Sequence, residues 1–228
     1  MKSVYSSCVF LMEWAILKGM DAKTIACYNR QAEKIAERYR EASGGISLWF
    51  PMAFPKVGSR ILDIGCGSGR DLMRLLEAGH DAYGWEPSSG LREEAIRAFP
   101  RLVGRIFDIS LPLDEKAAEC QPRFDGIVLS AVLMHLPPAL LSAGAEDVKR
   151  LLGMGGRLLV SVPWGERAVD DECRDDGGRL FMPISADNLA SLFSPPAFRL
   201  LDRRQTLDTL KREGIQWDTF LFERIAEC

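Results

Sequence analysis

The sequence has few of the residues that build metal sites or disulfide frameworks. Its 228 residues include two histidines and six cysteines, and no two cysteines have the CxxC spacing of a zinc site. We therefore predict no metal site. Cysteines scattered along a chain of this length are typical of a reducing compartment, so we expect a cytoplasmic location.

A strong charge of one sign is also absent. The sequence has 29 basic and 32 acidic residues, which gives a formal net charge of −3. Nucleic-acid-binding proteins usually carry a strong basic field. The charge balance therefore argues against a DNA or RNA partner, unless basic residues gather in a local patch.

Long hydrophobic runs are missing as well. Apolar residues at 9–12 and 14–17 are separated by Glu13, and the stretch is too short to span a bilayer, so we expect no membrane association. We interpret residues 1–20 as an N-terminal extension of undefined role: a helix packed on the domain or a segment before a true start at Met20, with a cleaved signal peptide as the lesser alternative. Residues 21–228 have the length and apolar content of a single domain.

Helical and strand patterns alternate beyond residue 20. Apolar residues recur at threes and fours from Asp21 to Gly44-Gly45, which predicts an N-terminal helix. Later helices are expected at 71–78, 88–99, 137–152 (capped by Gly153) and 185–193. Strands are expected at 60–65, 81–86, 105–109, 124–130, 156–162, 198–207 and 216–225. This order predicts an α/β fold with a doubly wound, mainly parallel seven-stranded sheet, an antiparallel edge pair and helices on both faces.

A glycine-rich turn joins the first predicted strand to the next helix. Gly65, Gly67 and Gly69 stand at alternate positions, and Asp63 precedes them at the end of the strand. Glycines permit positive φ and let a ligand approach the backbone, while the following helix presents free N–H groups. In an open α/β sheet this turn borders the ligand crevice. The alternative is a glycine-rich turn that binds nothing.

An acidic residue, Glu86, ends the second predicted strand. Its distance from the glycine turn is close to the ~20 residues typical of a carboxylate that accepts hydrogen bonds from ribose hydroxyls. Glu86 could instead cap the helix that follows. Because several nucleotide cofactors carry this ribose, Glu86 alone does not distinguish them.

The glycine turn, Glu86 and three later segments together resemble the motifs of class I, Rossmann-like S-adenosylmethionine-dependent methyltransferases. The later segments are Phe107-Asp108-Ile109, the run from Phe124 to Leu136, and the passage from Leu151 to Leu159. The resemblance covers about residues 28–162 and implies a methyltransferase with S-adenosylmethionine as cofactor. Met154 stands where family members often have proline, in a turn that contacts no ligand.

The resemblance also implies which residues hold the cofactor. Asp63 would bind the amino group of its methionine part, and Ser130 would lie near the sulfonium. Asp108 would accept from the adenine amino group, although it could equally be a plain loop carboxylate. The implied cofactor-binding residues are Asp63, Gly65, Cys66, Gly67, Gly69, Arg70, Glu86, Pro87, Asp108, Ile109, Ser130 and Ala131.

One histidine is a candidate general base for an acceptor that must lose a proton. His135 follows the fourth predicted strand on the reactive side of the sheet, and an ordinary imidazole suits proton transfer near neutral pH. His135 could instead pack against the helix that Pro137-Pro138 opens. We expect His80 to be structural.

The methyl acceptor is constrained mainly by what is missing. No [DNS]PP[YFW] tetrapeptide follows the fourth strand, no Pro-Cys pair marks a cytosine C5 enzyme, and no acidic cluster has metal-ligand spacing. A small-molecule acceptor remains by elimination. The aromatic residues at 49–54, with Tyr28 and Tyr39, could cover the site or pack in the core. The acidic run at 170–176 could favour a cationic acceptor or be a solvated loop.

Two other functions fit parts of the pattern. A nicotinamide-dependent oxidoreductase would place its third glycine where Arg70 stands. A non-catalytic protein that binds S-adenosylmethionine would share every cofactor motif, because these motifs concern binding. The sequence does not predict an oligomeric state.

Overall fold

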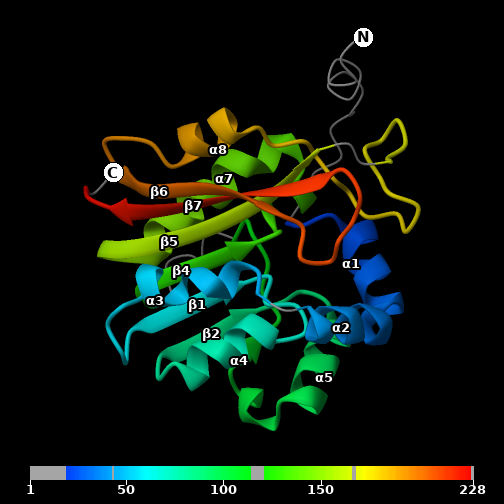
Figure 1. The fold of residues 1–228 in the computed structure, drawn as a ribbon, viewed down its shortest axis with the longest axis horizontal. Helices are drawn as coiled ribbons and strands as arrows, with labels where there is room; N and C mark the ends of the chain where they lie inside the picture. The colour runs from blue at the N-terminus through cyan, green and yellow to red at the C-terminus, as the bar shows by residue number, and fades with distance from the viewer. Residues whose placement is uncertain (1–18, 43, 114–120, 166–167, 227–228) are drawn as a thin grey trace.

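The structure is a computed structural model that describes residues 19–42, 44–113, 121–165 and 168–226 (Figure 1). The extension predicted for residues 1–20 lies almost entirely outside the described residues. Within the described ranges, seven strands form one sheet in the order β3-β2-β1-β4-β5-β7-β6. The strands are β1 Arg60–Ile64, β2 Asp81–Trp85, β3 Ile106–Phe107, β4 Phe124–Ser130, β5 Leu152–Gly165, β6 Phe198–Leu207 and β7 Ile215–Arg224.

The direction of the strands matches the sequence-based prediction. Strands β1 to β5 run parallel, and β7 lies antiparallel to both β5 and β6. The doubly wound, mainly parallel sheet with an antiparallel edge pair is therefore confirmed. Parallel strands bring their carboxyl ends to one edge, which is where such sheets bind ligands.

Helices cover both faces of the sheet, because successive side chains of each central strand point to opposite sides. In β1, Ile61 belongs to one buried cluster and Leu62 to the other. The face of Leu62 is covered by α7 and α8, and the face of Ile61 by α3, α4 and α5 (Figure 1). These helices span α3 Phe50–Ala53, α4 Arg70–Glu77, α5 Ser89–Ala98, α7 Pro138–Leu151 and α8 Ala186–Leu192.

The N-terminal helical region differs from the single helix that we predict. It consists of α1 (Ala22–Arg30) and α2 (Ala32–Glu41), which are separated at Gln31. Gln31 has φ −112° and ψ 15°, and its N–H donates to the Cys27 carbonyl and closes α1. Both helices pack on α5, so they cover the end of the sheet where the glycine turn lies (Figure 1).

The start of β5 also differs from the prediction. Gly153 does not cap α7 but lies inside β5, which begins at Leu152 directly after the helix. Leu152 pairs with Phe124 of β4 while its N–H still donates to Val148 of α7. Pairing with β4 thus extends β5 to residues before its apolar run. A local sequence pattern does not predict this extension, because it depends on the neighbouring strand.

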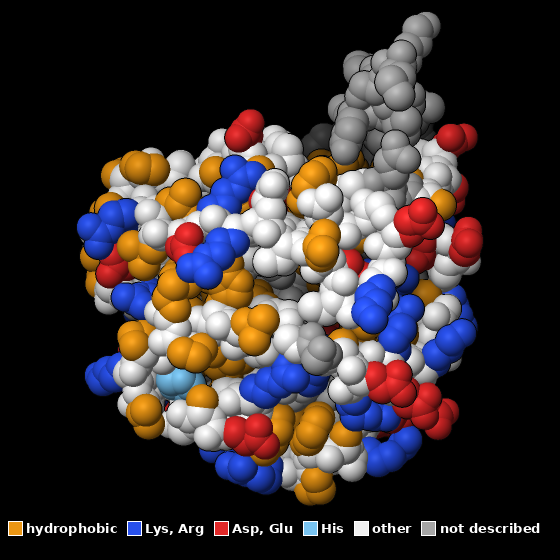
Figure 2. Space-filling view, in the orientation of Figure 1, with side chains coloured by type: hydrophobic (Ala, Val, Ile, Leu, Met, Phe, Trp, Pro, Cys, Tyr) orange, Lys and Arg blue, Asp and Glu red, His pale blue; other side chains and the backbone are white. Residues whose placement is uncertain are grey.

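Charged side chains are spread over the surface. Basic and acidic groups are interspersed on the face shown in Figure 2, with no continuous basic area there. Many of them pair locally, as Lys149 does with Glu146 at 2.6 Å. Across the described ranges, no helix is both long and apolar enough to cross a membrane.

Candidate active site

A cavity lies at the carboxyl ends of β1 and β4. The glycine turn forms one wall, and Tyr28 and Tyr39 from the N-terminal helices form another. Arg179 and Arg212, from two loops late in the chain, complete it. Of the residues predicted to bind the cofactor, those lining this cavity are Asp63, Gly65, Cys66, Gly67, Arg70, Ser130 and Ala131.

Asp63 is a buried carboxylate that faces this cavity. Its residue is 3% exposed, and no described residue donates a hydrogen bond to its side chain. Burial raises the pKa of the Asp63 carboxyl well above its ordinary value, and the negative charges of Asp71 and Glu86 raise that pKa further. A carboxylate held in this way costs free energy unless a cationic ligand group meets it.

The glycine turn needs its glycines for different reasons. Gly65 and Gly69 have φ of 69° and 76°, and a Cβ on either would come within 2.5 Å of a core side chain. Gly67, with φ 55°, would place its Cβ no nearer than 4.0 Å to any atom. Gly65 and Gly69 therefore permit close packing, whereas Gly67 keeps space open beside the cavity.

Glu86 holds this turn from the neighbouring strand. One oxygen of its carboxylate accepts from the Gly67 N–H at 2.9 Å and the other from the Ser88 N–H at 2.8 Å. Burial raises the pKa of Glu86 to about 7, although the two backbone N–H donors lower it. Each carboxylate oxygen keeps a second acceptor position, so the Glu86 carboxylate can accept further hydrogen bonds from a ligand.

The predicted cofactor-binding residues that do not line the cavity are Gly69, Glu86, Pro87, Asp108 and Ile109. Pro87 follows Glu86, and neither residue lines the cavity. Asp108 is exposed, and its carboxylate pairs with Arg92 at 2.9 Å. Ile109 donates its N–H to the Phe107 carbonyl in a tight turn that ends β3. The adenine-binding role of Asp108 and Ile109 remains a prediction.

The end of β4 brings two predicted residues to the cavity. The Ser130 hydroxyl lies 3.3 Å from that of Ser161 on β5. Ala131 has φ 60°, a conformation that costs free energy for a residue with a Cβ. Its N–H donates to the Ser161 carbonyl, which holds the strained residue at the cavity wall.

Cys66 and Arg70 contribute in ways that the sequence motif does not reveal. The Cys66 sulfur lies against Gly84 of β2, and burial raises the pKa of the thiol well above its ordinary value, so it is not an activated nucleophile. The Arg70 guanidinium pairs with Asp71 and donates to the carbonyl of Tyr39 at 3.0 Å. Arg70 therefore ties the end of α2 to the glycine turn.

His135 lies behind Tyr28, in the short 3-10 helix Leu133–His135, and does not itself line the cavity. Its Nε2 is 3.0 Å from the Tyr28 hydroxyl, and its Nδ1 is 2.6 Å from the Leu180 carbonyl. Because a carbonyl only accepts, Nδ1 carries the proton, and Nε2 accepts from Tyr28 in the neutral ring. The tyrosine, which sequence analysis treats as lid or core, thus stands between the histidine and the cavity.

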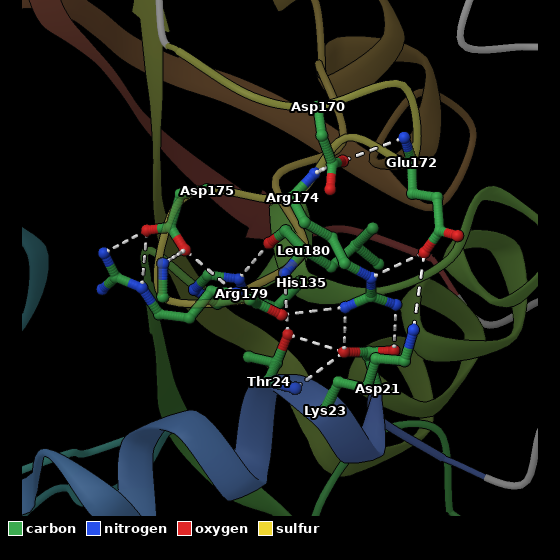
Figure 3. Close-up of polar contacts among 12 residues, drawn as sticks. Asp21, Lys23, Thr24, His135, Asp170, Glu172, Arg174, Asp175, Arg179 and Leu180 are labelled. Carbon is green, nitrogen blue, oxygen red and sulfur yellow. Dashed lines mark hydrogen bonds and ion pairs between the residues drawn. The ribbon is translucent and has the colours of Figure 1, made fainter.

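A buried network fixes α1 to the loop that follows β5 (Figure 3). Arg174 donates to both carboxylate oxygens of Asp21 at 2.9 Å, and the Leu180 N–H donates to the Thr24 hydroxyl at 2.8 Å. Asp21 also caps α1 through the Thr24 N–H. The network therefore positions the residues that contact His135 and Tyr28.

We expect Asp21→Asn to lower the free energy of unfolding by about 3 kcal/mol, since it leaves the buried Arg174 charge without its main partner. Burial raises the pKa of the Asp21 carboxyl, but the hydrogen bonds from Arg174 and Thr24 outweigh it and lower that pKa to about 2. This stabilisation is therefore complete above the unfolded pKa near 4 and is lost as the pH falls toward 2. Denaturant unfolding at neutral and acidic pH measures both effects.

Lys23→Gln provides the control for this prediction. Lys23 and Glu172 form an ion pair at 3.5 Å with side chains 68% and 63% exposed. An exposed pair of this kind contributes at most about 1 kcal/mol. Equal destabilisation by the two variants would show that the Asp21–Arg174 pair does not hold the loop.

The cavity includes residues that sequence analysis did not single out as a site. Arg212, Asp208 and Trp217 line it from the connection between β6 and β7 and from β7 itself. Arg179 appears in the sequence only as one of many charges in a polar loop. Two carboxylates of the acidic run pair within that loop, Asp175 with Arg179 at 2.6 Å and Glu172 with Arg174 at 3.3 Å. Of the charged residues that the structure describes in this loop, Arg179 lines the cavity.

Comparison with known proteins identifies the chain. A family model described as a methyltransferase domain matches residues 28–203, which is well over half of the sequence. The chain belongs to this methyltransferase family. An uncharacterized methyltransferase of Geobacillus kaustophilus is 28% identical over 205 residues, which cover 84% of this chain and 93% of that relative.

Solved methyltransferase structures share the fold. The 1,6-didemethyltoxoflavin-N1-methyltransferase of Burkholderia thailandensis, solved with its substrate and S-adenosylhomocysteine, superposes with a TM-score of 0.70 at 19% identity, covering 90% of this chain and 88% of that one. The magnesium protoporphyrin IX methyltransferase of Synechocystis, solved with S-adenosylmethionine, gives 0.62 at 17% identity, covering 91% and 99%. The family model confirms the predicted family, and the solved structures confirm the predicted fold. The methyltransferase family uses S-adenosylmethionine, which confirms the predicted cofactor.

Proposed function

We propose that this methyltransferase transfers a methyl group from S-adenosylmethionine to a small-molecule acceptor bound in the cavity beside Ser130 and Ala131. The observation that carries the proposal is Asp63, a carboxylate that is 3% exposed, lines the cavity and has no donor among the described residues. An ammonium group is the partner that such a carboxylate lacks. Bound S-adenosylmethionine supplies an electrophilic methyl group on a positively charged sulfur.

The residues of this chain contribute mainly binding and orientation. Asp63 and the backbone of the glycine turn bind the methionine part, and Glu86 accepts from the ribose hydroxyls while its carboxylate holds the turn. Orientation of two reactants in this manner lowers a barrier by about 7–11 kcal/mol. Tyr39 and Trp49 line the cavity and reduce the access of water to it.

The pair of Tyr28 and His135 removes a proton from an acceptor that carries one. The acceptor proton passes to the Tyr28 oxygen as the Tyr28 proton passes to His135 Nε2, so that the imidazole gains one proton and the acceptor loses one. The Leu180 carbonyl, which accepts from Nδ1, stabilises the imidazolium that results. His135 is therefore a positioning and proton-holding residue, and Tyr28 is the group that contacts the acceptor.

A small acceptor is supported by the composition of the cavity. Its walls come from the N-terminal helices, the ends of β1 and β4, and two late loops, so the acceptor is surrounded by side chains. Two structural neighbours are named as methyltransferases of small molecules, a toxoflavin precursor and a magnesium porphyrin.

Label transfer tests this function directly. The protein is incubated with methyl-labelled S-adenosylmethionine and an extract cleared of macromolecules, and labelled small products are separated. We expect Gly67→Arg to abolish transfer and S-adenosylhomocysteine binding, because its side chain would extend into the cavity. Gly104→Arg is the matched control, since Gly104 also has positive φ, at 74°, and no atom lies within 4 Å of its Cβ position. Binding of the cofactor product without any labelled product would favour a protein that binds S-adenosylmethionine without transferring its methyl group.

A further inference from the structure

Two arginines line the cavity in the same local arrangement. Arg179 follows Asp175 by four residues, and Arg212 follows Asp208 by four residues. In both turns the arginine N–H donates to the aspartate carboxylate at 2.9 Å, and the guanidinium returns to the same carboxylate through Nε and Nη2. Each aspartate thus fixes its arginine through three hydrogen bonds.

The paired aspartates leave one end of each guanidinium outside the ion pair. A guanidinium has five N–H donors in a planar fork, and the Nε–Nη2 edge is the one that the carboxylate occupies. The Nη1 end points away from that edge. Each guanidinium also packs against an aromatic ring: the Cζ atom of Arg179 lies 5.1 Å from the centre of the Phe181 ring, and that of Arg212 lies 5.9 Å from the centre of the Trp217 ring. Both arginines are therefore oriented in advance.

The charges around the cavity favour an acceptor with oxygen atoms that carry negative charge. A ligand that expels water from the Nη1 groups must supply hydrogen-bond acceptors in return, or the donors remain unsatisfied. Asp71 is paired with Arg70, and Asp208 with Arg212. The remaining carboxylate that lines the cavity is Asp63. Under the proposed function, it binds the ammonium group of the cofactor. No lining carboxylate of the described residues then remains for a cationic acceptor.

We infer that the methyl acceptor carries a carboxylate or similar oxyanion and that Arg179 and Arg212 bind it through their Nη1 groups. This inference deepens the proposed function and rests on it. It also replaces the cationic acceptor that the acidic run at 170–176 suggested, because no carboxylate of that run lines the cavity.

Binding of three matched probes tests the inference. The protein is saturated with S-adenosylhomocysteine and titrated with para-hydroxybenzoate, para-hydroxybenzamide and para-hydroxybenzylamine, while tryptophan fluorescence is followed because Trp49 and Trp217 line the cavity. We expect the carboxylate to bind at least about tenfold more tightly than the amide, as a charge-assisted hydrogen bond predicts. The amine should bind most weakly.

Substitutions assign the effect to the two arginines. Arg179→Gln and Arg212→Gln should each reduce the preference for the carboxylate by about tenfold, and Arg212→Lys should restore it only in part because lysine lacks the fork. Arg199→Gln, with a side chain 62% exposed on β6, should leave it unchanged. Absence of carboxylate binding, an equal or greater affinity for amide or amine, or a preference that survives both Gln variants would overturn the inference.

The labelled product from the extract gives an independent result. We expect it to be retained by an anion exchanger. A labelled product that is neutral or cationic would overturn the inference while leaving the proposed methyl transfer intact. If no product is labelled, the proposed function fails, and the probe titration still decides whether the two arginines bind an oxyanion.

Discussion

Asp63→Asn is expected to weaken S-adenosylhomocysteine binding by about tenfold to a hundredfold and to raise the stability of the ligand-free protein. The binding loss follows from replacing a charge-assisted hydrogen bond to an ammonium group, which contributes about 1.5–3 kcal/mol. The gain in stability follows from burial, because Asp63 has no described donor and its carboxyl pKa is raised well above the ordinary value.

The pH dependence of this gain has a definite sign. A carboxyl whose folded pKa is raised keeps its proton longer in the native state than in the unfolded state. The stability of the wild-type protein therefore falls as pH rises from the ordinary Asp pKa near 4 toward the raised value. The asparagine variant lacks this fall, so its advantage over the wild type should grow between acidic and neutral pH.

Calorimetric titration and thermal unfolding measure the two effects separately. Asp71→Asn serves as the control because Asp71 is paired with Arg70 at 2.8 Å and Arg74 at 3.3 Å. We expect Asp71→Asn to destabilise the protein, in contrast to Asp63→Asn. Tight cofactor binding by Asp63→Asn would remove the main support for the proposed function.

Tyr28→Phe is expected to lower kcat by about 10²–10⁴-fold for an acceptor that must lose a proton. The substitution keeps the ring beside Arg179 and removes the hydroxyl that lies 3.0 Å from His135 Nε2. Burial raises the pKa of the Tyr28 hydroxyl above its ordinary value, so the tyrosine is neutral until the acceptor proton moves. Cofactor affinity should change little.

Three further measurements separate this role from a structural one. His135→Asn should cause a similar loss of kcat, and the double variant should lose little more, because the two residues act as one unit. Tyr39→Phe also alters a tyrosine of the cavity but outside this pair, and it should retain most of the activity. If Tyr28→Phe keeps kcat within a few-fold while Tyr39→Phe does not, the assignment to Tyr28 is wrong.

Much of the fold and half of the candidate site can be predicted from the sequence because their signals are local. Apolar runs and helical periodicity indicate the order of strands and helices, and β4 and β6 begin and end where the pattern predicts. The glycine turn and Asp63 lie within seven residues, from 63 to 69, so their proximity follows from the chain itself. Local pattern predicts boundaries poorly where sheet pairing decides them, as at Leu152 and Gly153.

The part of the cavity formed by Tyr28, Arg179 and Arg212 depends on contacts between distant parts of the chain. Tyr28 and His135 are 107 residues apart, and Asp21 and Arg174 are 153 apart. Arg179 and Arg212 resemble ordinary surface charges in the sequence, and only their position beside the cavity distinguishes them. Whether the charge of such a residue faces solvent or a ligand is decided by the packing of loops.

By itself, the sequence determined the mainly parallel sheet and the glycine-rich turn after its first strand, since periodicity and glycine spacing act over a few residues. The tertiary structure decided that Tyr28 stands between His135 and the cavity and that paired arginines, not the acidic run, line it. These features depend on burial and on contacts between residues that are far apart in the sequence. The residues adjacent in sequence therefore do not predict them.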